Sequence, residues 1–381
     1  MIKQIKQFIK RETVLTIAAL LAVISSLIVH PDKEYVNYID FRTLAILFSL
    51  MSVMAGLKKQ GIFDVICRKL LKRTHNMLEL TCVLVGICFF FSMFITNDVA
   101  LITFVPFTFI VLNNLGDRIK TTYLLPIVCM QTIAANLGSM LTPIGNPQNL
   151  YLYSKSGMPI SEFIRLMLPY SLASLILLLI WIFFLCKKKD NEQITSIPDS
   201  GATHIDRKIV IMDIVLFVIC LLSVVRILPY AYAFAIVLAA AFLFDRQSLK
   251  AVDYSLLLTF VAFFVFIGNL GRLPEFSAWL KQILDGHEVL TAVLASQITS
   301  NVPAALLLSG FTDKTNLLII GTNLGGLGTL IASMASLISY RQIAREASDG
   351  KRKYFLIFTV SNVVFLAFLF LLWRVIKALA M

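Results

Sequence analysis

The chain alternates between long uncharged or nearly uncharged stretches and short charged segments. Seven of the stretches approach the roughly 20 apolar residues that one membrane-spanning helix needs. They cover residues 13–29, 43–57, 166–186, 209–228, 230–244, 254–270 and 354–373. The first follows a basic N-terminus, but it lacks a small-residue cleavage site before His30, so we interpret it as a membrane helix rather than a signal peptide. The pattern predicts an all-α polytopic membrane protein.

Three further regions are too long for one span and are interrupted by polar residues. Residues 80–116 contain a single charge, residues 121–154 contain none, and residues 289–340 contain only two. We expect residues 80–116 and 289–312 to form re-entrant hairpins, which leaves about nine crossings. With the N-terminus cytoplasmic and the C-terminus outside, most of the 34 lysines and arginines then lie on the cytoplasmic side. Two full spans in place of each hairpin would keep the same orientation, so the charges leave that alternative open.

The composition supports a membrane protein and limits its partners. Hydrophobic residues make up 58% of the 381 residues and charged residues 15%, whereas soluble domains have roughly 45–50% and 25%. This excludes a soluble enzyme. We attribute the net charge of +12 to cytoplasmic loops that face anionic membrane lipid, and we expect no nucleic-acid partner. Two short amphipathic segments, residues 61–73 and 274–284, are expected to lie in the membrane interface.

The two halves of the chain match each other. Asp40 and Asp253 each precede an apolar span, which is followed in both halves by an interfacial helix, a hairpin and an interrupted helix. Residues 136–146 match residues 323–333 in Asn, Leu, Gly, Thr and Ile at a constant offset. Because one crossing separates the halves, the second copy would be inverted, as is typical of secondary transporters. We divide the chain into an N-terminal segment with the first helix (1–38), repeat 1 (39–190), a linker with a connecting span (191–229) and repeat 2 (230–381).

The interrupted segments bring polar groups into the membrane. Residues 142–149 hold two prolines, a glycine and three amide side chains, so we expect no continuous helix there. Such breaks are tolerated around a polar cavity, where half-helix N-termini face an anion and freed carbonyls hold sodium. Asp98 is the acidic residue expected deep in the membrane, and its carboxylate is either functional or a cap of the second hairpin arm. With no lysine or arginine expected at that depth, helix dipoles, amides and bound cations would balance an anion.

These motifs resemble those of the ion transporter superfamily, which includes divalent-anion/sodium symporters, citrate transporters, arsenite efflux permeases and one class of sodium/proton antiporters. The resemblance extends over residues 39–373. It rests on Thr96-Asn97-Asp98, on the run from Asn136 to Pro147, on Ser300-Asn301-Val302-Pro303 and on Asn323-Leu324-Gly325. It implies a homodimer in which each protomer has a scaffold domain and a transport domain that carries both hairpins and moves as an elevator.

The resemblance also implies where substrate and coupling ion bind. In dicarboxylate members, the hairpin tips and unwound segments bind the substrate carboxylates and two sodium ions. The substrate-binding residues carried over are Thr96, Asn97, Thr142, Asn146, Ser300, Asn301, Thr329 and Ser333. The coupling-ion residues are Asp98, Asn97, Asn136, Gly145, Asn301, Asn323 and Ala332. Sodium is the only metal ion expected, and we expect no further cofactor.

The tips depart from the dicarboxylate pattern, which reads Ser-Asn-Thr. Asp98 and Val302 stand where threonine is found, as in the arsenite and antiporter branches, whereas residues 142–147 resemble the carboxylate branch. The leading hypothesis is therefore alternating-access transport of a small anion, a di- or tricarboxylate, coupled to sodium or protons through Asp98. The alternatives are efflux of arsenite or a similar oxyacid, cation/proton antiport, and an anion channel. We expect no enzyme, because the sequence offers no intramembrane histidine, no paired aspartates and no nucleophile with a base.

Overall fold

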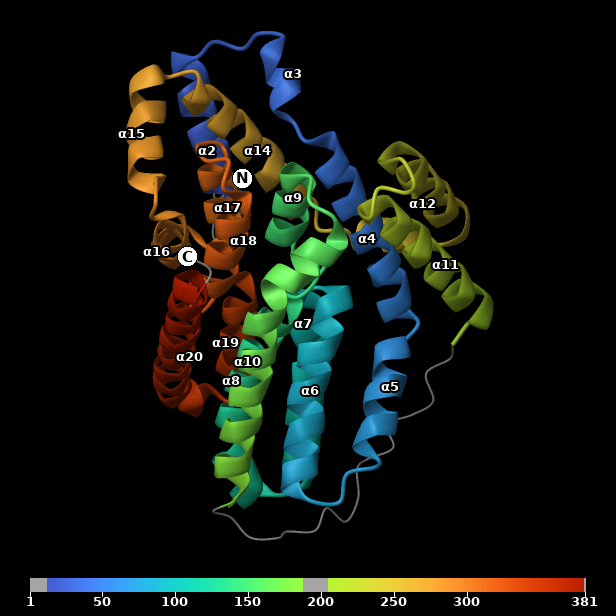
Figure 1. The fold of residues 1–381 in the computed structure, drawn as a ribbon. Helices are drawn as coiled ribbons and strands as arrows, with labels where there is room; N and C mark the ends of the chain where they lie inside the picture. The colour runs from blue at the N-terminus through green and yellow to red at the C-terminus, as the bar shows by residue number, and fades with distance from the viewer. Residues whose placement is uncertain (1–11, 188–204, 380–381) are drawn as a thin grey trace, which may run out of the picture.

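The computed structural model describes residues 12–187 and 205–379, which form α-helices and one short 3-10 helix without any strand (Figure 1). Six helical segments are long and apolar enough to cross a membrane. They are Phe41–Lys59, Met77–Ile95, Asn97–Asn114, Ile160–Lys187, Tyr254–Gly271 and Ser348–Leu379. The prediction of an all-α polytopic membrane protein is confirmed. The basic residues before Glu12 and the predicted boundary after residue 190 lie outside the described residues.

The first described range, residues 12–187, contains nine helices. They are α2 (Thr13–Ile28), α3 (Glu34–Tyr38), α4 (Phe41–Lys59), α5 (Ile62–Leu71), α6 (Met77–Ile95), α7 (Asn97–Asn114), α8 (Asp117–Ser139), α9 (Pro147–Ser156) and α10 (Ile160–Lys187). The predicted spans at 13–29, 43–57 and 166–186 correspond to α2, α4 and α10. The exposed side chains of α2 and α10 include Leu20, Leu27, Leu172 and Phe183, which suit a surface that faces acyl chains.

The second described range, residues 205–379, contains ten α-helices and the 3-10 helix η1. They are α11 (Arg207–Val224), α12 (Tyr230–Phe244), α13 (Arg246–Lys250), α14 (Tyr254–Gly271), α15 (Pro274–Leu284), α16 (Glu288–Thr299), α17 (Asn301–Ser309), α18 (Thr315–Leu324), α19 (Met334–Glu346), η1 (Ser348–Gly350) and α20 (Lys351–Leu379). The predicted span 209–228 ends earlier, at Val224, because Arg226 adopts a left-handed φ of 67° that a helix does not accommodate.

Asp40 and Asp253 start the helices for which the sequence pattern paired them. Asp40 Oδ1 accepts the backbone N–H of Thr43 at 3.0 Å, and Asp253 Oδ1 accepts that of Leu256 at 2.9 Å. Each bond satisfies one of the free amides at a helix N-terminus. The short helices α5 and α15 follow α4 and α14, where the amphipathic segments were expected. The two halves therefore begin with the same local structure.

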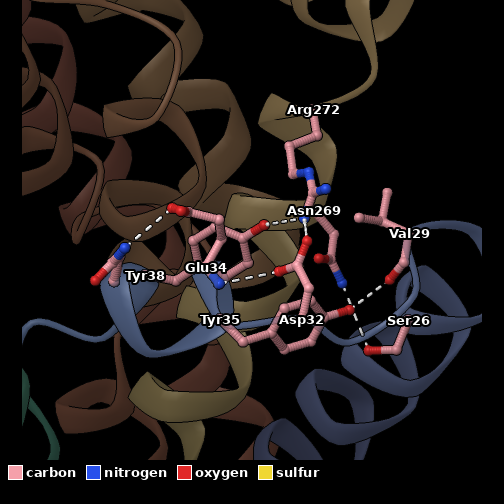
Figure 2. A network of polar contacts seen from close by, with 9 residues as sticks. Ser26, Val29, Asp32, Glu34, Tyr35, Tyr38, Asn269 and Arg272 are labelled. Atoms are coloured by element: carbon pink, nitrogen blue, oxygen red, sulfur yellow. Dashed lines mark hydrogen bonds and ion pairs between the residues drawn. The ribbon is translucent and has the colours of Figure 1, made fainter.

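The first described helix packs against the second half of the chain. Figure 2 shows Asn269 on α14 directed at Ser26 near the end of α2, to whose Oγ its Nδ2 donates at 3.5 Å. The same Nδ2 donates to Ser25 Oγ at 3.0 Å. Arg272 donates to Asp32 Oδ2 at 2.7 Å and to the Tyr38 hydroxyl at 3.2 Å. The Tyr38 ring lies against Gly268, where an added Cβ would be 2.3 Å from the ring. These contacts join α2 and α3 to α14.

Candidate functional site

Both predicted hairpin tips consist of a single residue between two helices. Thr96 joins α6 to α7 with φ 67° and ψ 150°, and Ser300 joins α16 to α17 with φ 77° and ψ 155°. Residues other than glycine rarely adopt this conformation, which costs on the order of 1–3 kcal/mol. The same strained geometry at both tips shows that each chain reversal is held in place by its surroundings.

Two breaks separate helices that the sequence pattern predicted to be interrupted. Residues 140–146 lie between α8 and α9, and residues 325–333 lie between α18 and α19. The first break folds tightly, since a Cβ at Gly145 would be only 2.0 Å from the backbone oxygen of Ser139. Asn146 then starts α9, its Oδ1 accepting the backbone N–H of Asn149 at 3.1 Å.

Each hairpin tip contacts the break in its own half of the chain. The backbone N–H of Asn97 donates to the Gly145 carbonyl at 3.2 Å, and the backbone N–H of Asn301 donates to the Ala332 carbonyl at 3.0 Å. The Ser300 hydroxyl adds a longer bond to Ala332, at 3.5 Å. Two segments that the sequence aligned at a constant offset thus make the same contact. The N-termini of α7 and α17 both lie at a helix break.

Side chains from the two breaks also bind each other. Six buried residues in two hydrogen-bonded groups form what we call the amide cluster: Asn97, Asn136 and Ser333, and Asn146, Asn149 and Asn323. Ser139 connects the two groups, because its hydroxyl accepts from Asn146 Nδ2 at 3.2 Å and donates to the Asn136 carbonyl at 2.9 Å. Asn136 Oδ1 accepts Asn97 Nδ2 at 3.0 Å and Ser333 Oγ at 2.9 Å. Asn323 Nδ2 donates to Asn149 Oδ1 at 2.6 Å, and Asn146 Nδ2 donates to Asn323 Oδ1 at 3.3 Å. In Figure 1, α6 to α8 lie below α17 and α18. The bonds Asn146–Asn323 and Ser333–Asn136 connect the two halves of the chain.

Three polar atoms in this region are buried without a hydrogen-bond partner. They are the donors Asn136 Nδ2 and Gln148 Nε2 and the acceptor Asp98 Oδ1. Leaving such a group unpaired costs about 1–3 kcal/mol. Asp98 follows Asn97 directly, and Asp253 is close enough for the two charges to interact. The two vacant donors can bind acceptor atoms of a solute, and the vacant carboxylate oxygen can accept a proton or bind a cation.

The remaining predicted residues differ in where they lie. The Thr142 hydroxyl donates to the Met93 carbonyl and holds the first break against α6. Thr329 is exposed and hydrogen-bonds Gln297, through its N–H at 2.9 Å and its hydroxyl at 3.2 Å, so it lies outside the amide cluster. Asn149 and Gln148 were not among the predicted residues. The amide-rich run 142–149 was the signal that could have identified them.

Comparisons with known proteins match nearly the whole chain. A family described as citrate transporter matches residues 4–316. "Inner membrane protein YbiR" of Escherichia coli is 33% identical over 314 residues, covering 81% of this chain and 82% of that protein. "Uncharacterized transporter MJ0456" of Methanocaldococcus jannaschii is 33% identical over 317 residues, covering 82% and 84%. The rice "Silicon efflux transporter LSI3" is 31% identical over 163 residues, covering 42% of this chain and 32% of that protein.

Proposed function

The chain belongs to the citrate transporter family, and from that membership we propose that it moves a small anion across the cytoplasmic membrane by secondary active transport. The family and its named relatives make the protein a membrane transporter. The name of the Escherichia coli relative favours the inner membrane. The substrate class that we propose is a di- or tricarboxylate, coupled to sodium ions or protons.

The unpartnered buried donor of Asn136 carries this proposal. Asn136 Nδ2 lies within the amide cluster and has no acceptor, although Asn136 Oδ1 receives two hydrogen bonds. A carboxylate oxygen would supply that acceptor. The N-termini of α7 and α17 contact the two breaks and add partial positive charge there, which would stabilise an anion.

Two inverted repeats would account for the matching tips. We propose that residues 39–190 and 230–381 are these repeats, with α11 as the connecting span. The first tip contacts a break after which α9 continues for ten residues. If α8 and α9 together cross the membrane, the break and this tip would lie inside it, and the hairpin would be re-entrant. In the first hairpin, α6 and α7 have 19 and 18 residues, enough for full crossings by length alone. We propose that the protein is a homodimer and that each transport domain moves as an elevator to give alternating access. The N-terminus would be cytoplasmic and the C-terminus outside.

Asp98 is the proposed coupling residue. Its vacant Oδ1 would accept a proton or bind sodium, so that the loaded transport domain crosses with its charge balanced. The test is uptake of citrate and succinate into proteoliposomes under imposed sodium or proton gradients. We expect Asp98→Asn to abolish the dependence of uptake on the coupling gradient. The matched control is Asp117→Asn, which alters an exposed carboxylate at the start of α8 and should keep that dependence. Unchanged rate and gradient dependence in Asp98→Asn would refute this role.

Efflux of a neutral oxyacid is the second candidate. The described hydrogen-bond partners of the amide cluster are amides, hydroxyls and backbone carbonyls, all uncharged. A partial relative is named a silicon efflux transporter. This candidate predicts flux of silicic acid or arsenite that does not respond to membrane voltage. Cation/proton antiport would instead acidify or alkalinise the lumen without any anion, and a channel would show neither saturation nor counterflow.

A further inference from the structure

A second buried carboxylate lies outside the amide cluster, on the helix that connects the two halves. Asp213 is on the second turn of α11, and only 3% of the residue is exposed. Its Oδ2 is buried without a hydrogen-bond partner. The sequence pattern placed Asp213 within a predicted span but assigned it no role. An acid so buried requires a compensating partner.

Gly56 on α4 makes the space for this carboxylate. A Cβ at Gly56 would lie 2.5 Å from Asp213 Oδ2 and 3.0 Å from Oδ1, so a larger residue there would force the carboxylate to move. The carboxylate therefore lies directly against the backbone of α4. Gly56 thus leaves room for the carboxylate in the contact between α4 and α11.

The same face of α4 presents further polar groups. Ser52, Gly56 and Lys59 are spaced by four and three residues, so they share one face of the helix. Lys59 Nζ lies 2.8 Å from Asp245 Oδ1, and the Ser52 and Ser248 hydroxyls are 3.3 Å apart. The junction of α12 and α13 thus covers this face.

Asp245 contributes a second vacant oxygen. Its residue is 5% exposed, and its Oδ2 is buried without a partner although Oδ1 binds Lys59. Asp245 and Lys59 both lie close enough to Asp213 for their charges to interact. On α11 itself, the nearest charges are Arg207 and Lys208 at its start.

The charges of this cluster do not balance. Two carboxylates and one ammonium leave a net charge of −1, which is costly in a buried site within a membrane protein. One monovalent cation neutralises it, whereas a divalent ion would leave an excess of positive charge. The vacant oxygens of Asp213 and Asp245 are the hard ligands that such a cation prefers.

We propose that Asp213 and Asp245, framed by Gly56 and Lys59, form a second cation site that takes one Na⁺ or one proton. Lys59 has 42% of its side chain exposed and gives the site a connection to water. The residues belong to α4, α11 and the junction of α12 and α13, separate from the helices that carry the amide cluster. The proposal therefore holds whichever solute is transported.

The test uses purified full-length protein in nanodiscs, in the Asp98→Asn background so that the proposed coupling site does not contribute. The melting temperature is measured against NaCl, with choline chloride holding the ionic strength constant, and separately against pH from about 5 to 9. We compare this background with added Asp213→Asn, Asp245→Asn or Lys59→Gln. Asp117→Asn on α8 serves as the matched control.

Each outcome decides the proposal. If the site binds sodium, NaCl stabilises the background protein, and Asp213→Asn and Asp245→Asn raise the half-saturating NaCl concentration by about tenfold. Lys59→Gln lowers that concentration, because removing the ammonium increases the net negative charge of the site. For a proton, NaCl has no effect, the melting temperature changes with pH, and Asp213→Asn removes that change. The proposal is overturned if neither NaCl nor pH affects the background protein, or if the variants shift the melting temperature equally under all conditions. Lys59→Gln retains both carboxylates, so the test does not depend on whether Asp213→Asn folds.

Discussion

Asn146 Nδ2 donates to Asn323 Oδ1 across 3.3 Å and joins the first helix break to the end of α18. Asn323 in turn donates to Asn149 Oδ1 at 2.6 Å. One amide therefore connects two breaks that are 177 residues apart in the chain. Side chains rather than backbone contacts join the halves at this point, which makes Asn323 a sensitive position.

Asn323→Ala should destabilise the protein strongly. The substitution leaves Asn146 Nδ2 without its bond to Asn323 and removes the donor to Asn149, all in a buried region. Each unpaired group costs about 1–3 kcal/mol. Thermal or denaturant unfolding in detergent measures the loss. Asn114→Ala, at an exposed residue whose amide bonds only Ile110 in its own helix, should change stability by less than about 0.5 kcal/mol. Equal effects of the two substitutions would contradict this interpretation of the cluster.

Gly138→Ala should destabilise the packing of α8 on α6. A Cβ at Gly138 would lie 2.0 Å from the Phe89 carbonyl oxygen, which belongs to the α6 backbone and cannot move aside easily. We expect a loss of about 1–3 kcal/mol. The matched control is Gly86→Ala, because Gly86 is also helical and its Cβ would meet nothing within 4 Å. That variant should gain up to about 1 kcal/mol from helix propensity. If the Gly138→Ala protein is as stable as the Gly86→Ala protein, α6 and α8 can move apart at little cost, and the predicted loss is wrong.

Ser300→Gly should stabilise the fold while it weakens transport. Ser300 has φ 77°, a conformation that glycine adopts without strain, so its replacement should relieve on the order of 1 kcal/mol. The hydroxyl that contacts Ala332 is lost, and the tip becomes less restrained, which should raise KM for uptake. Arg226→Gly is the comparison, since Arg226 also has a positive φ of 67° but donates to Gly157 at 2.6 Å and to Tyr153 at 3.2 Å. Arg226→Gly should be less stable, and the opposite order of melting temperatures would count against stored strain at the tip.

The ion pair beside the second hairpin should make stability depend on pH. A hydrogen bond from Lys314, whose Nζ lies 3.0 Å from Asp285 Oδ1, and the lysine charge lower the pKa of Asp285 below 3.8. A carboxyl with a lowered pKa stabilises the fold above its unfolded pKa, and that contribution disappears as the pH falls through the folded pKa. The melting temperature of the unaltered protein should therefore fall more steeply below about pH 4 than that of Asp285→Asn.

Salt provides the check on this pair. Asp285 and Lys314 are both accessible to solvent, so the difference between the unaltered protein and Asp285→Asn should shrink in about 1 M salt. Asp349→Asn changes another exposed carboxylate, which lies in η1. Its melting temperature should still fall steeply at acid pH. If the melting temperature of Asp285→Asn falls as steeply at acid pH as that of the unaltered protein, other carboxyls cause the acid sensitivity.

The sequence predicted the helices and the tips well, because the signals for both are local. Uncharged runs identified the spans, and Asp40 and Asp253 marked the starts of α4 and α14. Asn97 and Asn301 directly follow the residues that reverse the chain. Hairpin tips need residues that can begin a helix, and such residues are rare inside apolar segments.

The contacts between distant residues could not be predicted in the same way. Ser333 bonds Asn136 across 197 residues, and no local pattern specifies that pairing. Thr329 aligned with Thr142, yet it bonds Gln297 and lies at the surface. Asp213 lies in a run that looks like any other span, and its burial depends on the space left by Gly56 on another helix. Such features follow from packing, which the alternation of polar and apolar residues does not encode.

The amide cluster has a consequence for the range of solutes that one scaffold can accept. A primary amide has a donor end and an acceptor end, and a half-turn of its terminal torsion exchanges them. Asn97, Asn136, Asn146, Asn149 and Asn323 are all of this kind. Backbone groups fix four of them, since Asn97 and Asn146 each accept a backbone N–H and Asn149 and Asn323 each donate to a backbone carbonyl. Asn136 is oriented by Asn97 Nδ2 and Ser333 Oγ, which both donate to its Oδ1 and leave its donor end without a partner. The cluster therefore offers a donor of fixed direction, and a solute that binds there must present an acceptor to it.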